Sequence, residues 1–190
     1  MNITPLFPTP IGKVYNFITE KERLRLLESI KKRKHVKHCA IIGDGSSSYS
    51  VSSNVLDRDI VKRLEDSVNE YVEEYGCKDV KFQYSWSSVQ NKGSRLTEHT
   101  HPNAIVSGTL YINVDQSCKL YFHNPNPYIF YTDRGDDSKE VNEFTPYTYE
   151  HYWIPVENSL LVLFPSWLRH GKNDEESEMD NRRVVSFNFG

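Results

Sequence analysis

The order of apolar and polar residues divides the chain near residue 78 into a part with helical spacing and a part with strand spacing. In the first part, Thr19 and Glu22 have the spacing of a capping box, in which each side chain hydrogen-bonds the backbone N–H of the other at the start of a helix. The apolar face predicted for this helix consists of Leu24, Leu27 and Ile30. The basic residues 31–34 are typical of its C-terminus.

A second helix is predicted over residues 57–75. Its apolar stripe consists of Ile60, Leu64, Val68, Tyr71 and Tyr75. Gly76 is expected to end it, because glycine accepts the left-handed conformation that follows many helices. Between the two helices, the glycine- and serine-rich segment 43–48 predicts a flexible polar loop, either passive or a lid over a site.

After residue 78, β-branched and aromatic residues alternate with polar ones, which indicates strands. The predicted strands cover residues 80–89, 104–114, 118–122, 150–154, 159–164 and 182–189. The acidic segment 133–142 predicts an exposed loop. Helices followed by many short strands predict one α+β domain over residues 1–190, with a mainly helical part in 1–78 and a β-sandwich or barrel core in 79–190.

Composition narrows the class of protein without naming a function. The formal net charge of −3 and the lack of a basic tract make nucleic acid an unfavoured partner. No apolar run is long enough to span a bilayer and no signal-peptide pattern opens the chain, so no membrane association is expected. The three cysteines Cys39, Cys77 and Cys118 are odd in number and widely spaced, which favours a reducing cytoplasm over a disulfide framework. The sequence is compatible with a homodimer.

Three histidines follow stretches that are predicted to be strands. His99 and His101 are two residues apart, so in an extended segment both side chains point to the same face. His170 follows the buried strand 159–164 and a turn. Three imidazoles on neighbouring strands suit the mouth of a jelly roll, and such an open, nitrogen-rich site usually binds iron, zinc or copper. The other histidines, interpreted as surface or core residues, are His35, His38, His123 and His151, with His123 on a strand that could border the pocket.

The last predicted strand carries arginine into an apolar setting. One of its faces holds Arg182, Val184, Ser186 and Asn188, and the other holds Arg183, Val185 and Phe187. An inward-facing guanidinium near a metal suits an acidic co-substrate, because it pairs with a carboxylate through two parallel hydrogen bonds. The strand alternation alone leaves Arg182 and Arg183 as alternatives for this role. Trp86 and Trp167 are predicted to be walls of the site or core residues.

The sequence resembles the Fe(II)/2-oxoglutarate-dependent dioxygenases, and within them a group of short bacterial and phage oxygenases. The resemblance covers nearly the whole chain and is carried by Leu6-Phe7-Pro8-Thr9-Pro10, His99-Thr100-His101-Pro102-Asn103, Ser107-Gly108, Tyr111-Ile112-Asn113, Phe164-Pro165-Ser166-Trp167 with His170, and Arg182 to Asn188. It implies an α+β fold with a double-stranded β-helix (jelly-roll, cupin-like) core and N-terminal helices packed on it. It also implies an oxidoreductase that couples decarboxylation of 2-oxoglutarate to oxidation of a substrate, with hydroxylation as the usual outcome.

The resemblance also implies roles for individual residues. Fe(II) would be bound by His99, His101 and His170, and the co-substrate 2-oxoglutarate by Arg182, Tyr111 and Ser186. The broader superfamily usually has His-x-Asp, so His101 stands in the position of a carboxylate and removes one negative charge from the site. Halogenating relatives usually have a small residue there, which argues against halogenation. The implied partners are O2 and an unknown substrate, either a small molecule or a protein side chain.

Two other classes of function fit the same residues. One is a 2-oxoglutarate-independent three-histidine dioxygenase or another cupin-like metal enzyme, in which Arg182 would have no oxoacid to bind. The other is a non-catalytic jelly-roll binding module, which would bind no metal. As a further hypothesis, the segments around Ser46 and Asp136 gate access to the site.

Overall fold

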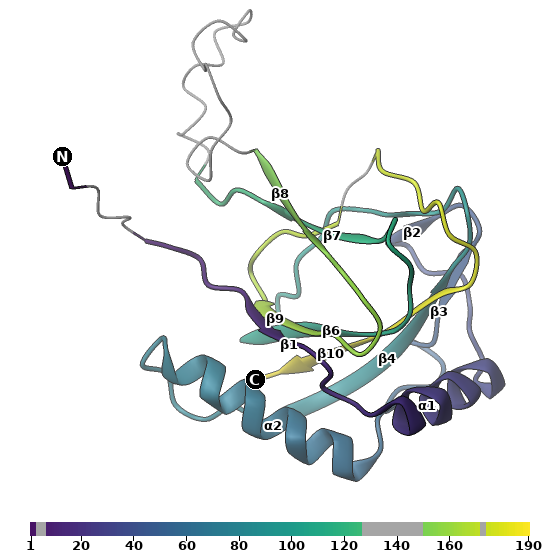
Figure 1. The fold of residues 1–190 in the computed structure, drawn as a ribbon, viewed down its shortest axis with the longest axis horizontal. Helices are drawn as coiled ribbons and strands as arrows, with labels where there is room; N and C mark the ends of the chain where they lie inside the picture. Colours follow the sequence, from purple (N-terminus) through teal and green to yellow (C-terminus); the bar gives the residue numbers. More distant parts are fainter. Residues whose placement is uncertain (3–6, 127–149, 172–173) are drawn as a thin grey trace, which may run out of the picture.

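A six-stranded antiparallel sheet forms the central layer of the molecule (Figure 1). The computed structural model describes residues 1–2, 7–126, 150–171 and 174–190. The predicted loop 133–142 and the gating hypothesis around Asp136 therefore lie outside the described residues. The order of the strands is β1-β9-β6-β10-β4-β3. Their bounds are Gly12–Val14 (β1), Gly45–Ser47 (β3), Phe82–Gln90 (β4), Val106–Asn113 (β6), Leu161–Pro165 (β9) and Arg182–Phe189 (β10).

Two helices, α1 (Glu20–Lys32) and α2 (Arg58–Glu73), cover one face of this sheet (Figure 1). The capping box predicted for α1 is confirmed, since the Thr19 hydroxyl accepts from the Glu22 N–H and the Glu22 carboxylate accepts from the Thr19 N–H. The predicted apolar face is partly wrong. Leu24 is 47% exposed and Leu26 is buried in its place, whereas Ile30 is buried and Leu27 packs partly buried against the core, as predicted. Leu24 and Leu26 lie about 200° apart around a helix, so only one of them can face the core.

Helix α2 buries the predicted stripe with one exception. Its fully buried residues include Ile60, Leu64, Val68 and Tyr71. The helix ends at Glu73, two residues earlier than predicted, and Tyr75 lies 40% exposed beyond it. Gly76 has a φ of +63°, as expected for the residue that reverses the chain after a helix. Among the described residues, neither helix is both long and apolar enough to cross a membrane.

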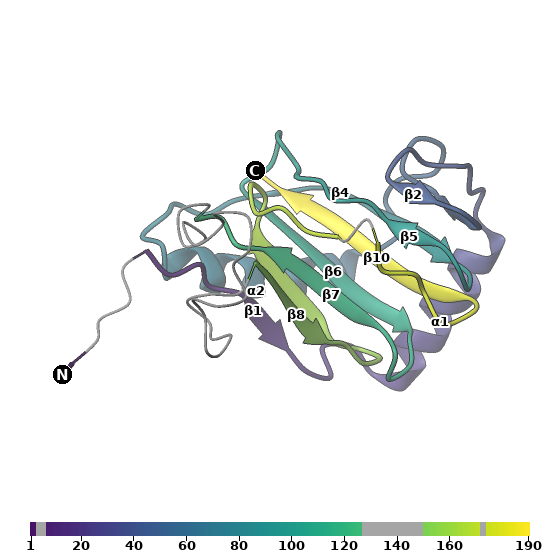
Figure 2. The same ribbon diagram turned by 90° about the horizontal axis from the view of Figure 1, so that it is seen from above.

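A two-stranded hairpin, β7 (Lys119–His123) and β8 (His151–Pro155), lies over the other face of the central sheet (Figure 2). A second short pair consists of β2 (Ile41–Ile42) and β5 (Arg95–Leu96). Apolar residues from β7 and β8, including Leu120, Phe122 and Ile154, pack against the facing side of the central sheet. Together with the helices on the opposite side, these antiparallel layers form the α+β arrangement expected from the sequence.

The central sheet is buried on both faces, and its strands alternate accordingly. On β6, Leu110 and Ile112 belong to the core beneath the helices, whereas Tyr111 belongs to the core under the β7–β8 hairpin. On β10, Val185 packs on the helix side and Val184 on the hairpin side. Residues of even number on β10 therefore face the space between the two sheets.

The six predicted strands are all present, each within two residues of its expected ends. The short strands β1, β2, β3 and β5 were not predicted. Because β1, β2 and β3 lie before residue 78, the first part of the chain is less purely helical than expected. The segment 43–48 is also not a flexible loop. Gly45 to Ser47 pair with β4, and Ser47 and Ser48 are buried and hydrogen-bonded to Ser87.

Candidate active site

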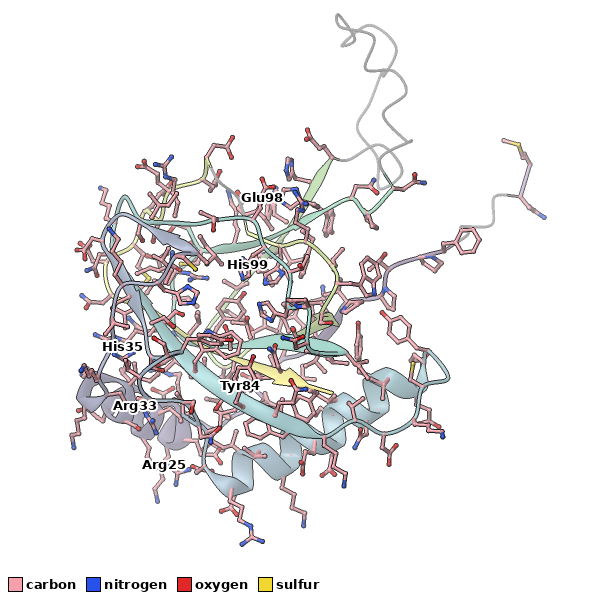
Figure 3. All side chains as sticks on the ribbon, turned by 180° about the vertical axis from the view of Figure 1, so that it is seen from behind. Arg25, Arg33, His35, Tyr84, Glu98 and His99 are labelled. Atoms are coloured by element: carbon pink, nitrogen blue, oxygen red, sulfur yellow. The ribbon has the colours of Figure 1, made fainter. Side chains whose placement is uncertain are left out.

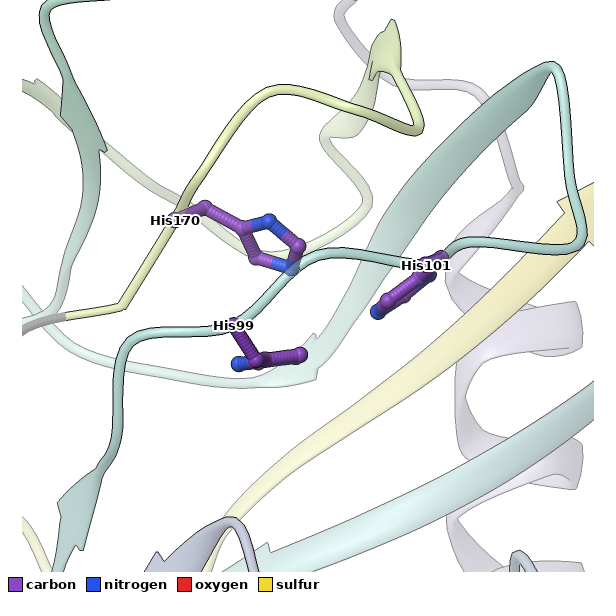
Figure 4. Close-up of side chains that lie close together, drawn as sticks. All are labelled: His99, His101 and His170. Carbon is purple, nitrogen blue, oxygen red and sulfur yellow. The ribbon is translucent and has the colours of Figure 1, made fainter.

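His99, His101 and His170 come together between the central sheet and the β7–β8 hairpin (Figure 4). The nitrogen atoms that they offer as ligands all lie within 4.8 Å of one another. The ring centroids of His99 and His170 are 4.3 Å apart, and that of His101 is 5.0 Å from His170 and 5.2 Å from His99. His170 is buried and the other two are partly exposed toward a cavity. The three side chains singled out in the sequence are thus close enough to share one metal ion.

Backbone hydrogen bonds fix the spacing of two of these histidines. The N–H of His99 donates to the carbonyl of His170 at 3.0 Å, and the N–H of His170 donates to the carbonyl of His99 at 3.1 Å. This isolated antiparallel bridge joins the connection between β5 and β6 to the segment after β9. The prediction that these histidines end regular strands is therefore only partly right, because His99 and His101 lie in an extended connection.

The same pair is oriented by its own backbone. His99 Nδ1 lies 2.8 Å from the carbonyl oxygen of Thr97, and His170 Nδ1 lies 3.0 Å from the carbonyl oxygen of Leu168. A carbonyl can only accept a hydrogen bond, so Nδ1 carries the proton and Nε2 keeps its lone pair in both rings. In a metal-bound histidine, one ring nitrogen usually binds the metal and the N–H of the other donates a hydrogen bond to an oxygen atom.

His101 is oriented by side chains instead. Its Nδ1 lies 2.8 Å from both the Asn188 Oδ1 and the Ser107 Oγ. The Ser107 hydroxyl donates to the same Asn188 oxygen, and the Asn188 amide donates to the Tyr84 hydroxyl at 3.0 Å. Asn188 is therefore an acceptor toward His101, which again leaves Nε2 free of its proton. Sequence analysis placed Asn188 on the inner face of its strand but gave it no role, since a lone amide on a strand forms no motif.

Burial keeps all three imidazoles neutral. It lowers the pKa of His101 to about 4, lowers that of His99, and lowers that of His170 well below its ordinary value. The neighbouring imidazoles act in the same direction on His101 and His170, because one protonated ring disfavours another. Neutral rings with free lone pairs are the form that binds a cation, so little proton release accompanies metal binding at neutral pH.

A cavity of about 340 Å³ opens beside the histidines and is lined by residues from the inner face of the sheet. Its wall includes Arg182, Tyr111, Ser186 and Thr109. The Arg182 guanidinium lies 5.9 Å from the centre of the Tyr111 ring and donates to the Gln90 side-chain oxygen. Arg183 does not line the cavity and points to the other face of β10, where it hydrogen-bonds Asn181. The structure therefore brings the predicted co-substrate residues together on one wall.

The Tyr111 hydroxyl has a feature that indicates a missing ligand. It is fully buried and, within the described part of the chain, has no hydrogen-bond partner. Burial raises the pKa of Tyr111, so the hydroxyl remains a donor. A buried unpaired donor is unfavourable unless something else accepts from it. Beside a guanidinium on a cavity wall, the group that satisfies both is a carboxylate, so the residues present fit 2-oxoglutarate.

The outer part of the cavity is aromatic. Trp86 is buried and lines it, as predicted, with its ring centroid 5.6 Å from that of His101. Tyr49 and Tyr84, which sequence analysis missed, also line the cavity. The Tyr49 ring packs edge-on against Trp86, and the Tyr84 ring packs against Trp86 at a tilt of 34°. The prediction for Trp167 is wrong, because its side chain is 56% exposed and is neither wall nor core.

The remaining histidines lie outside the triad. His35 is half-buried and contacts the Ser87 hydroxyl, and His38 lines the rim of the cavity. His123 and His151 pack edge-on with ring centroids 4.2 Å apart, away from the cavity lining.

Comparison with known proteins assigns the family. A family model described as "Putative 2OG-Fe(II) oxygenase", where 2OG is 2-oxoglutarate, matches residues 84–188, which is more than half of the chain. The chain therefore belongs to the 2-oxoglutarate- and Fe(II)-dependent oxygenases. The resemblance inferred from the sequence is confirmed, and so is its implication of an oxidoreductase that uses Fe(II), 2-oxoglutarate, O2 and a substrate. No curated protein matches the sequence significantly.

Solved structures support the fold. A prolyl-4-hydroxylase from Pseudomonas putida has a TM-score of 0.62 at 11% identity, over 95% of this chain and 92% of that chain. A collagen prolyl hydroxylase from Paramecium Bursaria Chlorella virus-1, solved with 2-oxoglutarate, has a TM-score of 0.60 at 7% identity, over 94% of each chain. HygX from Streptomyces hygroscopicus, with nickel and 2-oxoglutarate bound, has a TM-score of 0.61 at 12% identity, over 96% and 83%. The expected double-stranded β-helix fold is thereby confirmed.

Proposed function

We propose that the chain hydroxylates its substrate at an Fe(II) ion bound by His99, His101 and His170. One observation carries the proposal: the three neutral imidazoles and the Arg182–Tyr111 pair line the same cavity. Three protein ligands leave further coordination positions open, which a catalytic metal needs for co-substrate and O2. When bound, Fe(II) and 2-oxoglutarate would supply the oxidation with O2 as the oxidant: one oxygen atom of O2 ends in succinate as the oxoacid loses CO2, and the other ends in the hydroxyl group formed at a C–H bond of the substrate.

The far carboxylate of 2-oxoglutarate would be held by Arg182 and Tyr111. The guanidinium offers a charged fork and the tyrosine a donor without another partner, so both interactions strengthen when the carboxylate arrives. Ser186 faces the same space, with its Oγ 3.5 Å from the Thr109 hydroxyl, and adds a polar edge. Gln90 holds the guanidinium in place from behind. Because these groups and the histidines line the same cavity, they would orient the co-substrate with its oxoacid end toward the histidines.

The cavity favours an uncharged, carbon-rich part of the substrate. Among the described residues that line it, Arg182 is the single Asp, Glu, Lys or Arg, so no carboxylate is present to bind an amine. Tyr49, Tyr84 and Trp86 offer ring faces and edges next to His101. A neutral ring such as a prolyl side chain, the group modified by two of the structural relatives, fits this lining. His101 fills the position that a halide would need, so hydroxylation is favoured over halogenation.

The charge and the cysteines of the chain bear on its substrate and its location. The net charge of −3 supports a small molecule or protein side chain, rather than a nucleic-acid duplex, as the substrate. Cys39, Cys77 and Cys118 are all unpaired, which supports a cytoplasmic location.

Anaerobic optical titration tests the site. Fe(II) and then 2-oxoglutarate are added to the metal-free protein, and a visible metal-to-ligand charge-transfer band is expected only after both additions. His170→Ala should abolish the band. Arg182→Ala should weaken 2-oxoglutarate binding at least thirtyfold, since removing one partner of a desolvated charge pair costs about 2–5 kcal/mol. Arg183→Ala is the matched control, because the adjacent guanidinium faces away from the cavity, and it should bind 2-oxoglutarate normally.

Three results would overturn parts of this proposal. Iron binding without the band would favour the 2-oxoglutarate-independent three-histidine enzyme. No metal binding would favour a recognition module. Equal effects of Arg182→Ala and Arg183→Ala would remove the assigned role of Arg182.

A further inference from the structure

Glu98, His123 and His151 form a second cluster of metal-ligating side chains, outside the cavity. The atoms that they offer as ligands all lie within 4.8 Å of one another. Glu98 Oε1 is 3.5 Å from His123 Nε2, and the rings of His123 and His151 pack with centroids 4.2 Å apart. We propose that this cluster binds a second divalent cation, Zn²⁺ by its chemistry, independently of the iron site.

The backbone places the two clusters on opposite sides of one segment. Glu98 directly precedes His99 in an extended connection, so their side chains point in opposite directions. In Figure 3, Glu98 lies farther from the central sheet than His99. His123 and His151 are paired residues across the hairpin, at the end of β7 and the start of β8. None of the three lines the cavity, so an ion here would not occupy the co-substrate site.

The ligand set and its accessibility suit zinc. Two imidazoles and one carboxylate with an open fourth position are a common zinc arrangement, completed by water. With Zn–N distances of about 2.0–2.1 Å, tetrahedral ligand atoms lie roughly 3.3 Å apart. Ligand atoms that lie within 4.8 Å of one another must therefore draw together by at most about 1.5 Å. The side chains of His123, Glu98 and His151 are 13%, 21% and 25% exposed, so an ion can reach them from solvent.

Within the described residues, the Gly171 carbonyl, Arg169 and Glu150 are close enough to affect this site. His123 Nε2 lies 3.0 Å from the Gly171 carbonyl as well as 3.5 Å from Glu98 Oε1. An ion at Nδ1 would keep the carbonyl contact, which is the outer-shell arrangement typical of a metal-bound histidine, and an ion at Nε2 would replace it. Arg169 Nη1 is 3.6 Å from Glu98 Oε2, and Glu150 Oε2 is 3.9 Å from His151 Nδ1. The guanidinium opposes a cation, but its side chain is 62% exposed and can move into water at little cost. The Glu150 carboxylate partly compensates that charge.

A bound ion would clamp the β7–β8 hairpin to the segment that carries the iron-site histidines. The hairpin is already attached nearby, since the His123 N–H donates to the Arg169 carbonyl at 2.9 Å. Zinc binding would therefore strengthen the attachment of the β7–β8 hairpin to this segment without entering the cavity.

Zinc stoichiometry of the tag-free protein, measured by equilibrium dialysis and elemental analysis, tests the inference. We expect two equivalents for the wild type, one for Glu98→Gln/His151→Ala, one for His101→Ala/His170→Ala, and none for the combined variant. His35→Asn removes a histidine outside both clusters and should still bind two. Glu98→Gln alone keeps the side-chain shape and should weaken the second equivalent at least tenfold, with an unchanged circular dichroism spectrum.

The result identifies which site fails. A wild type that binds one equivalent, lost in His101→Ala/His170→Ala and kept in Glu98→Gln/His151→Ala, overturns the second site and leaves the iron site standing. A single equivalent with the opposite dependence supports the second site and contradicts the first. Two equivalents in Glu98→Gln/His151→Ala would also overturn the inference.

Discussion

The three histidines of the candidate iron site are held by two kinds of contact. His99 and His170 each donate to a backbone carbonyl two residues earlier, which no side-chain substitution removes. His101 depends on the side chains of Asn188 and Ser107. At His101, the contacts that orient the ring can therefore be removed by mutation while the histidine itself is kept. At His99 and His170 they cannot, because those contacts are made to the backbone.

Asn188→Ala should lower Fe(II) affinity while leaving the three ligands in place. Loss of a hydrogen-bond acceptor behind a ligating histidine typically weakens metal binding by roughly 10–100-fold. Because the Ser107 hydroxyl can still accept from His101, the effect should approach its full size only in Ser107→Ala/Asn188→Ala. Anaerobic Fe(II) titration measures the change. Asn113→Ala, which removes an amide bound only to a surface carbonyl, should bind iron as the wild type does. Equal affinities in Asn188→Ala and Asn113→Ala would contradict this role.

At the scale of single residues, sequence analysis found those that belong to a pattern. The histidines were recognisable by their spacing, and the two faces of a strand separated Arg182 from Arg183 once a family pattern selected between them. The roles of Asn188, Gln90 and Thr109 could not be predicted from the sequence. Each is a single polar residue on a strand, and the residues that it contacts depend on how the strands pair. Trp167 was misjudged for a similar reason, since a turn lets a large apolar side chain point outward.

At the scale of elements, the start of α1 depends on reciprocal hydrogen bonds between Thr19 and Glu22. Thr19→Ala should lower the free energy of unfolding by about 0.5–2 kcal/mol, the usual effect of removing a helix cap. Urea denaturation measures the change. Thr100→Ala, at an exposed position outside any helix, is the control and should leave the urea midpoint unchanged. A midpoint for Thr19→Ala equal to that of the control would contradict a stabilising cap.

Strands long enough for apolar and polar residues to alternate several times were predicted well, and very short strands were not. The strand from Arg182 to Phe189 has the predicted ends. Strands β1, β2, β3 and β5 contain two or three residues each, too few for a period of two to appear. Their position is set by pairing with longer strands, as Gly12 to Val14 pair with β9. In α1, Leu24 and Leu26 both fit a helix, and only the neighbouring sheet decides which is buried.

At the scale of the whole molecule, several neutral histidines make the metal-free protein sensitive to acid. Burial is the main cause of a lowered pKa in His35, His38, His99, His101 and His170. Below about pH 6.5 the unfolded chain binds protons at these positions and the folded chain does not, so stability must fall as the pH falls. The loss should continue toward pH 4, where His101 itself titrates in the folded state.

Urea midpoints of the metal-free protein between pH 8 and pH 5 measure this linkage. We expect little change above pH 7.5 and a progressive decrease below pH 6.5. His35→Gln should flatten the decrease, because one buried imidazole no longer contributes. Midpoints that stay constant or rise on acidification would contradict the linkage.

The candidate active site lies on one face of the central sheet, and the helices pack on the other. Its helix-facing side packs an apolar core against α1 and α2, whereas its other side carries both a second apolar core, beneath the β7–β8 hairpin, and the cavity with its polar wall. Side chains of successive residues on β10 point to opposite faces of the sheet. Val185 therefore packs in the core beneath the helices, whereas Ser186 lines the cavity.

The paired backbone bridge between His99 and His170 has a consequence for redesign of the site. Two ligands are fixed as a unit by main-chain hydrogen bonds, whereas the third is oriented by the side chains of Ser107 and Asn188. Changes at position 101 and at these two residues can therefore alter the charge around the metal while the bridge stays intact. His101→Asp would add one negative charge to the site on the same framework.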